Sequence, residues 1–227
     1  MTDQIDHTDQ TDPIDQTDHI DSIEDMDNVH IDPSVFRKYD IRGKVAGDNP
    51  QITPGLANMV GKALGTYLPK EFHSDMMFVG CDNRETSTPI RKALIEGVAS
   101  TGMKVTDIGE VLTPTVYFAS ASYGPHGAGV MITGSHLDTS FNGIKMAYGK
   151  LALAGEQIQD LLQMIQDRVF VVGEGSIAED FDMINKHMEK ISSMVTLEKP
   201  LKVVMDSGNG LSGTYVPAVL EKLGVDL

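Results

Sequence analysis

Residues 133–145 read TGSHLDTSFNGIK and form a polar loop between two apolar segments. The apolar run 128–132 precedes this loop, and the run 144–147 follows it. Both runs have the length and character of short strands. Because loops held on a rigid scaffold carry much of the chemistry of proteins, Ser135 is the candidate reactive residue.

The segments before this loop alternate between strand and helix patterns. Strands are predicted at 76–80, 103–108 and 128–132, and helices after Pro54, at 89–101 and at 114–122. Such alternation indicates an α/β fold with a mixed, mostly parallel sheet sandwiched by helices. Ser135 would then lie beyond the carboxyl end of a strand, where open α/β sheets bind ligands.

The segments after the loop predict a second, incomplete α/β domain. Helical patterns cover 155–168, the set Phe181, Ile184, Met188 and Ile191, and the set from Val216 to Leu223, with a strand at 201–205. One such unit cannot bury both faces of a sheet. We therefore predict an acidic tail at 1–32, a first domain at 33–177 and the beginning of a second domain at 178–227.

The acidic tail contains eleven Asp and Glu residues and no Lys or Arg, so the net charge of −15 falls to −4 for residues 33–227. An acidic residue occupies every third position from 3 to 27. This period matches neither a helix nor a strand, and disorder is expected. The tail is either an interaction or solubilising arm or a repeat without a specific role.

Composition excludes several classes of function. No basic stripe offsets phosphate repulsion, so nucleic acid is not an expected partner. No apolar run reaches the 18 residues of a membrane helix, so no membrane association is expected. Cys81 is the single cysteine, which favours a reducing, cytoplasmic setting. It reads as a small buried residue and not as a reactive thiol.

The residues around Ser135 limit its chemistry. A serine hydroxyl is a weak nucleophile that needs activation, and the loop lacks the G-x-S-x-G pattern of a nucleophile elbow. His136 is adjacent and would point to the opposite side of an extended chain. A serine that carries a phosphoryl group needs cations nearby, and Lys145, Arg42 and Arg84 are candidates. A structural serine in a turn is the alternative.

Four motifs in order resemble the α-D-phosphohexomutases. The serine loop TGSH at 133–136 with FNGIK at 141–145 resembles the active-site serine loop of that family. FRKYDIRG at 36–43, GCDNRETS at 80–87 and the strand and G-N-G turn at 201–210 resemble three further family motifs. Together they extend over residues 34–227.

The resemblance implies a phosphoryl transfer between the 1 and 6 positions of a hexose phosphate, through a 1,6-bisphosphate. Ser135 would be the phosphoserine, and glucose 1,6-bisphosphate an activator. Mg²⁺ would bridge its phosphate and a D-G-D-x-D-R loop. The matching motifs also imply roles for the remaining site residues. Lys145 and Arg42 would neutralise charge, assist proton transfer and bind substrate, and Tyr39 would bind substrate. His136 would shape the loop or contact phosphate, and a supporting role is implied for Asp82, Arg84 and Asn142. Asp82 and Arg84 could alternatively only brace a turn.

The form of the FRKYDIRG motif, with Tyr39, resembles the phosphomannomutase/phosphoglucomutase branch and implies mannose or glucose phosphates. Two departures favour an alternative. Leu137-Asp138 replaces the Asn-Pro of the family pattern, and residues 1–227 contain no D-G-D-x-D-R. These residues alone are therefore expected to lack mutase turnover. The alternative is a truncated or degenerate homologue that acts as a binding or regulatory module.

Overall fold

The computed structural model describes residues 29–227, so the predicted disorder of residues 1–28 lies outside the described part. Residues 29–32 were expected in the tail but pack on the fold. Val29 is buried in the core, and the Asp32 carboxylate accepts hydrogen bonds from Ser34 N at 2.9 Å and Gln51 Nε2 at 2.6 Å. The predicted end of the tail at residue 32 therefore lies too far along the chain, because Val29 and the capping carboxylate of Asp32 already belong to the folded part.

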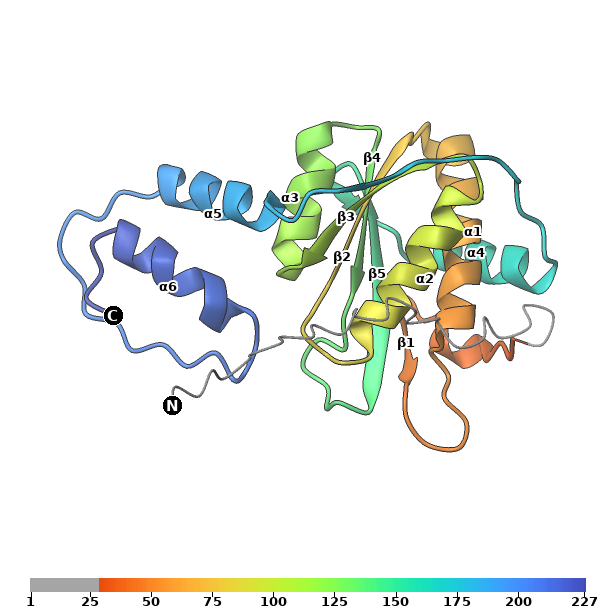
Figure 1. The fold of residues 1–227 in the computed structure, drawn as a ribbon, viewed down its shortest axis with the longest axis horizontal. Coiled ribbons are helices and arrows are strands. Elements are labelled where there is room, and N and C mark those ends of the chain that lie inside the picture. Colours follow the sequence, from red (N-terminus) through yellow and green to blue (C-terminus); the bar gives the residue numbers. More distant parts are fainter. Residues whose placement is uncertain (1–28) are drawn as a thin grey trace, which may run out of the picture.

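A mixed sheet in the order β1-β5-β4-β2-β3-β7 forms the centre of the fold (Figure 1). β2 pairs in parallel with β4 and β3, and β3 with β7, whereas β5 runs antiparallel to β1, β4 and β6. The sequence prediction of a mixed α/β sheet is confirmed. The strands are β1 (Ile41–Lys44), β2 (Met76–Cys81), β3 (Lys104–Glu110), β4 (Gly127–Ile132), β5 (Phe141–Tyr148), β6 (Leu151–Ala152) and β7 (Ile177–Glu179).

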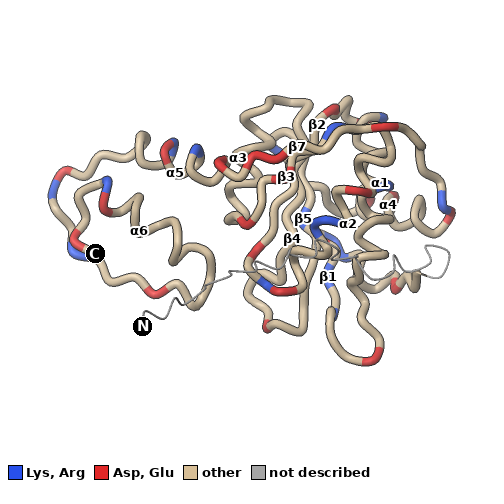
Figure 2. Tube along the Cα trace, in the orientation of Figure 1, with Lys and Arg blue, Asp and Glu red and all other residues tan. Residues whose placement is uncertain are grey.

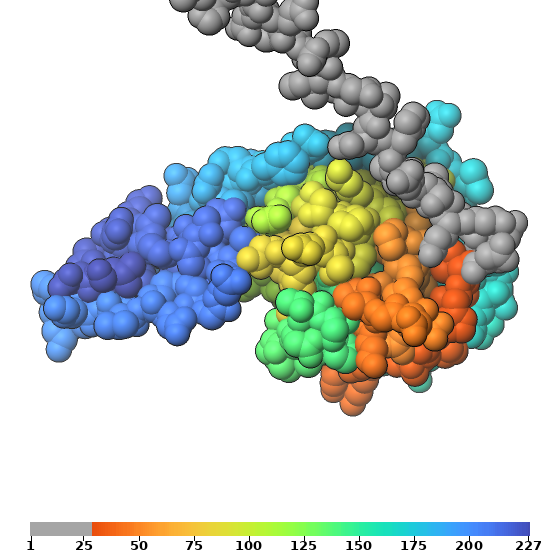
Figure 3. All heavy atoms as spheres, turned by 60° about the horizontal axis from the view of Figure 1, so that its bottom comes forward, coloured from red at the N-terminus to blue at the C-terminus, as the bar shows by residue number. Residues whose placement is uncertain are grey.

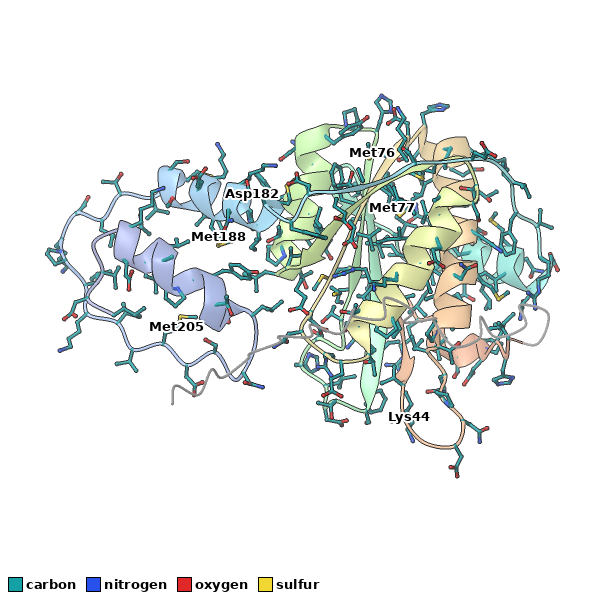
Figure 4. The ribbon with its side chains drawn as sticks, in the orientation of Figure 1. Lys44, Met76, Met77, Asp182, Met188 and Met205 are labelled. Atoms are coloured by element: carbon teal, nitrogen blue, oxygen red, sulfur yellow. The ribbon has the colours of Figure 1, made fainter. Side chains whose placement is uncertain are left out.

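Helices cover both faces of this sheet. The helices are α1 (Pro54–Phe72), α2 (Ser87–Ala99), α3 (Thr113–Tyr123), α4 (Glu156–Gln166), α5 (Met183–Met194) and α6 (Ser212–Lys222), with a 3-10 turn at Pro33–Val35. α1, α2 and α4 share the larger hydrophobic core, and α3, α5 and α6 share a second one. Met188 projects from α5 on the side facing α6 (Figure 4). No helix within residues 29–227 is long and apolar enough to span a membrane.

The local sequence explains how these elements are placed. Thr53 caps α1 by accepting a hydrogen bond from Leu56 N at 3.1 Å, and Pro54 occupies the first turn. Met76 and Met77 begin β2 at the end of the sheet opposite to Lys44 (Figure 4). Because β2 and β4 are parallel, their carboxyl ends lie at one edge, where both continue into polar loops.

Two predictions for the C-terminal part are wrong. Phe181 precedes α5 instead of belonging to it, and its ring lies over Gly109, where an added Cβ would be 2.9 Å from Cδ1. Residues 201–205 form no strand. Within residues 29–227 their only bridge is Lys202 to Asp226, and a strand needs a longer ladder of partners. Val204 is accordingly 95% exposed.

Candidate functional site

Ser135 lies at the edge of the sheet where β2 and β4 end, in the loop 133–140 between β4 and β5. Its side chain is exposed and its φ is +58°, in the left-handed region. A non-glycine residue in that region costs roughly 1–2 kcal/mol. The loop must therefore be held by other contacts, and the structure shows them on both sides.

Thr133 and Asp82 hold the serine from the side of β2. Thr133 Oγ1 accepts a hydrogen bond from Ser135 N at 2.8 Å and donates one to Asp82 Oδ2 at 2.8 Å. The other oxygen of Asp82 accepts from Arg84 N at 3.2 Å and Ser87 Oγ at 2.5 Å. The sequence reading gave no role to Thr133. Its position directly after an apolar strand was the available signal.

Arg42 and Lys145 lie on the other side of the loop and share the carboxylate of Asp40. Arg42 Nη1 donates to Gly134 O at 2.8 Å, and Arg42 Nη2 lies 2.6 Å from Asp40 Oδ2. Lys145 Nζ lies 3.3 Å from the same oxygen. Arg42 is buried, with 8% of its side chain exposed, and Lys145 is more accessible at 25%. Arg42 therefore braces the loop, whereas Lys145 has room to contact a ligand.

Asp40 stays ionised in this arrangement. Burial works to raise its pKa, but the hydrogen bonds and positive charges of Arg42 and Lys145 outweigh burial and lower the pKa below its ordinary value. In the sequence Asp40 stands out only as part of the FRKYDIRG motif. The structure shows that one carboxylate oxygen joins the two predicted cations.

Replacement of Asp40 by asparagine should therefore destabilise the fold in a pH-dependent way. A carboxyl with a lowered folded-state pKa contributes stability above its unfolded pKa, and this contribution is lost as pH falls through the folded value. We expect a loss of about 1 kcal/mol at pH 7 that shrinks from about pH 4 downward. Urea unfolding of both proteins across this range measures it. Asp48→Asn at an exposed site is the control, and a difference independent of pH would contradict the assignment.

The remaining predicted residues fall into separate places. His136 is exposed beside Ser135, with no hydrogen bond among the described residues. Asn142 is fully buried and donates to Thr86 Oγ1 at 3.0 Å and Ser87 Oγ at 2.9 Å, which ties β5 to the start of α2. Tyr39 is 65% exposed, with Lys38 Nζ 5.1 Å from its ring centre.

Leu137-Asp138 does not leave the loop loose. The Asp138 carboxylate accepts hydrogen bonds from Ser140 N, at 2.8 Å, and from Ser140 Oγ, which close a turn. These bonds, the hydroxyl bond first, lower the pKa of Asp138. The carboxylate thus has a local partner, and the turn replaces the stiffening that a proline would give.

A cleft of about 1100 Å³ opens at this edge. Its walls include Ser135, His136, Asp82 and Arg84, the loop after β1 and the G-N-G turn before α6, whereas Arg42, Lys145, Tyr39 and Asn142 are not among its lining. In Figure 3 the serine loop (green) lies beside the loop after β1 (orange). Asn83 Nδ2 donates to Asn209 O at 3.2 Å and joins the two sides of the cleft. Figure 2 shows charges of both signs interspersed over the described residues.

Sequence comparison with known proteins identifies the family of this chain. Residues 33–171 match the family described as phosphoglucomutase/phosphomannomutase, alpha/beta/alpha domain I. The chain is 38% identical over 191 residues to a phosphomannomutase/phosphoglucomutase of Pseudomonas aeruginosa, covering 84% of this chain and 40% of that protein. It is 33% identical over 192 residues to a phosphoglucomutase of Neisseria meningitidis, again covering 84% and 40%.

A solved structure of a phosphoglucomutase/phosphomannomutase family protein is also similar to this chain. A phosphoglucomutase/phosphomannomutase family protein of Burkholderia thailandensis superposes with a TM-score of 0.80 and 32% identity, over 87% of this chain and 44% of that one. The chain thus spans about two fifths of the length of these relatives. On the matched sequence and the shared architecture, the chain belongs to the phosphoglucomutase/phosphomannomutase family.

Proposed function

We propose that Ser135 carries a phosphoryl group in a hexose-phosphate mutase reaction, with mannose or glucose phosphate as substrate. One observation carries the proposal: the Ser135 hydroxyl is exposed at the wall of a cleft while its backbone is fixed from both sides. Fixing a reacting atom before substrate arrives lowers the entropic part of the barrier. The relatives named as phosphomannomutase/phosphoglucomutase supply the reaction class.

The proposed step balances without another reactant. The P–O bond to Ser135 breaks, a P–O bond to a hydroxyl of the sugar monophosphate forms, and the proton of that hydroxyl ends on the serine oxygen. The 1,6-bisphosphate then returns its other phosphate to Ser135. Lys145 is the proposed cation for the moving charge, because 25% of its side chain is exposed, whereas Arg42 is 8% exposed and already donates to Gly134. His136 and Tyr39, both exposed, are proposed as phosphate and sugar contacts.

The described residues do not by themselves fit a Mg²⁺ ion. Within 29–227 no group of three His, Cys, Asp or Glu side chains is placed to hold a metal. Near Ser135 the carboxylates of Asp82 and Asp138 already accept hydrogen bonds, whereas Mg²⁺ demands near-ideal octahedral oxygen geometry. We propose that the phosphate on Ser135 is the only ligand from these residues.

Phosphopeptide mass spectrometry tests the phosphoserine directly. The chain is incubated with glucose 1,6-bisphosphate and Mg²⁺, and we expect one phosphate on Ser135. Ser135→Ala should lose the label completely, whereas Ser122→Ala, at an exposed helical serine, should retain it. A label on another residue, or no label on the unchanged chain, would refute the proposed phosphoserine.

A non-catalytic binding or regulatory module is the second candidate, and Leu137-Asp138 in place of the Asn-Pro of the family pattern favours it. The two candidates separate in the same labelling experiment. A module of this kind would leave Ser135 unphosphorylated. For the mutase, labelling should occur, while conversion of mannose 1-phosphate by residues 1–227 alone should stay at background.

A further inference from the structure

Arg84 makes an unusually complete set of contacts with the serine loop. It lies between β2 and α2, two residues after Asp82, and only 14% of its side chain is exposed. Nε lies 3.1 Å from Asp82 Oδ2. The two terminal nitrogens donate to backbone carbonyl oxygens of the loop: Nη1 to Asp138 at 2.5 Å and Phe141 at 3.2 Å, and Nη2 to Ser135 at 3.2 Å and Leu137 at 2.6 Å.

These contacts use every donor of the side chain. A guanidinium has five N–H groups in a fixed planar fork and no acceptor. One is directed at Asp82 and four at loop carbonyls, so none is left for a phosphate oxygen. Arginine–phosphate pairs are frequently bidentate, and such a pair takes two N–H donors. The positive charge of Arg84 is thus neutralised by Asp82 and by the carbonyl dipoles.

The guanidinium also packs directly against the loop backbone. A Cβ added to Gly134 would lie 2.4 Å from Arg84 Cζ and 2.7 Å from its Nε. Glycine therefore stands at 134 because the arginine fills the space that a side chain would need. The next residue, Ser135, has the left-handed φ of +58°, and its carbonyl oxygen is one of the four that Arg84 binds.

We propose that Arg84 is the positioning residue of the serine loop and does not bind substrate phosphate. Arg84 holds Ser135 in its left-handed conformation through backbone carbonyls, and so directs the hydroxyl into the cleft. Its importance for phosphoryl transfer rests on the proposed phosphoserine function. Lysine cannot replace it, because an ammonium has three donors that do not form a planar fork.

Hydrogen exchange tests the positioning without any phosphoryl chemistry. In Arg84→Lys and Arg84→Ala, the backbone amides of 135–141 should exchange at least about tenfold faster, while those of β3 stay unchanged. Arg37→Lys, at an exposed arginine outside the loop, is the matched control and should leave the amides of 135–141 unaffected. Unchanged exchange in both Arg84 variants would overturn the proposal.

The labelling reaction distinguishes positioning from phosphate binding. With glucose 1,6-bisphosphate, Arg84→Lys should lower the rate of Ser135 labelling by about 10–100-fold, with an unchanged half-saturating concentration. A raised half-saturating concentration with an unchanged maximal rate would instead identify Arg84 as a phosphate ligand and overturn the proposal. If the unchanged chain is not labelled, the proposed phosphoserine function is refuted, and so is the role of Arg84 in positioning Ser135 for transfer. The hydrogen-exchange experiment then decides by itself whether Arg84 holds the loop.

Discussion

Replacing Asp82 with alanine should lower the free energy of unfolding by about 3 kcal/mol and abolish detectable labelling of Ser135. The carboxylate accepts hydrogen bonds from Arg84, Ser87 and Thr133, and 17% of it is exposed. Its removal leaves a largely buried guanidinium N–H and two hydroxyls without their acceptor, and such groups cost about 1–3 kcal/mol each when the site cannot relax. Urea unfolding followed by circular dichroism measures the first effect, and phosphopeptide analysis measures the second.

Asp82→Asn separates shape from charge in this network. The amide keeps one acceptor oxygen but replaces the other with an N–H₂ donor, which would face an Arg84 N–H together with the hydroxyl of either Ser87 or Thr133. We expect a destabilisation between that of alanine and zero, and partial labelling. Asp48→Ala, at an exposed aspartate in the loop after β1, should change neither quantity. If Asp82→Ala unfolds at the same urea concentration as the unchanged chain, the network does not hold the loop.

The sequence predicts the sheet and the serine loop well because their signals are local. Short apolar runs separated by helical periods place β2, β3 and β4 within a few residues, and Ser135 follows one of them directly. The strand predicted at 201–205 is wrong because strand pairing depends on contacts that are not local in sequence. An apolar run shows that a strand is possible, but pairing depends on which partners lie beside it. Among residues 29–227 only Asp226 forms a bridge to this segment.

The contacts around Ser135 could not be predicted in detail, because they join residues distant in sequence through the backbone. Arg84 binds carbonyl oxygens more than fifty residues away. Every residue type has a backbone carbonyl, so the sequence does not indicate which of them will accept these hydrogen bonds. Asp40 joins Arg42 to Lys145 across β1 and β5, which becomes visible only when the two strands are known to be neighbours. Motif matching therefore named these residues without showing which of them contact one another.

The largest stability effect is expected at a buried ion pair away from the cleft. Asp107 on β3 and Arg91 on α2 lie 3.2 Å apart between Oδ1 and Nε, with 11% and 9% of their side chains exposed. Arg91 also donates to Cys81 Sγ at 3.1 Å, and burial raises the pKa of that thiol to about 11 despite the arginine. The thiol is therefore neutral, and Asp107 is the charged partner of Arg91. Asp107→Ala should destabilise the fold by about 3–5 kcal/mol, because it leaves a buried guanidinium without its counter-charge.

The double variant Arg91→Met with Asp107→Ala should recover most of that loss. The Nε of Arg91 has no well-directed hydrogen bond despite its short distance to Asp107, so the pair contributes little beyond mutual neutralisation. An apolar methionine removes the charge that needs a partner. A residual loss of about 1–2 kcal/mol should remain, because Gly109 N loses the Asp107 oxygen that accepts its hydrogen bond at 2.9 Å. Urea unfolding of the two single variants and the double variant gives the coupling energy, and losses that simply add would show that the two side chains do not interact.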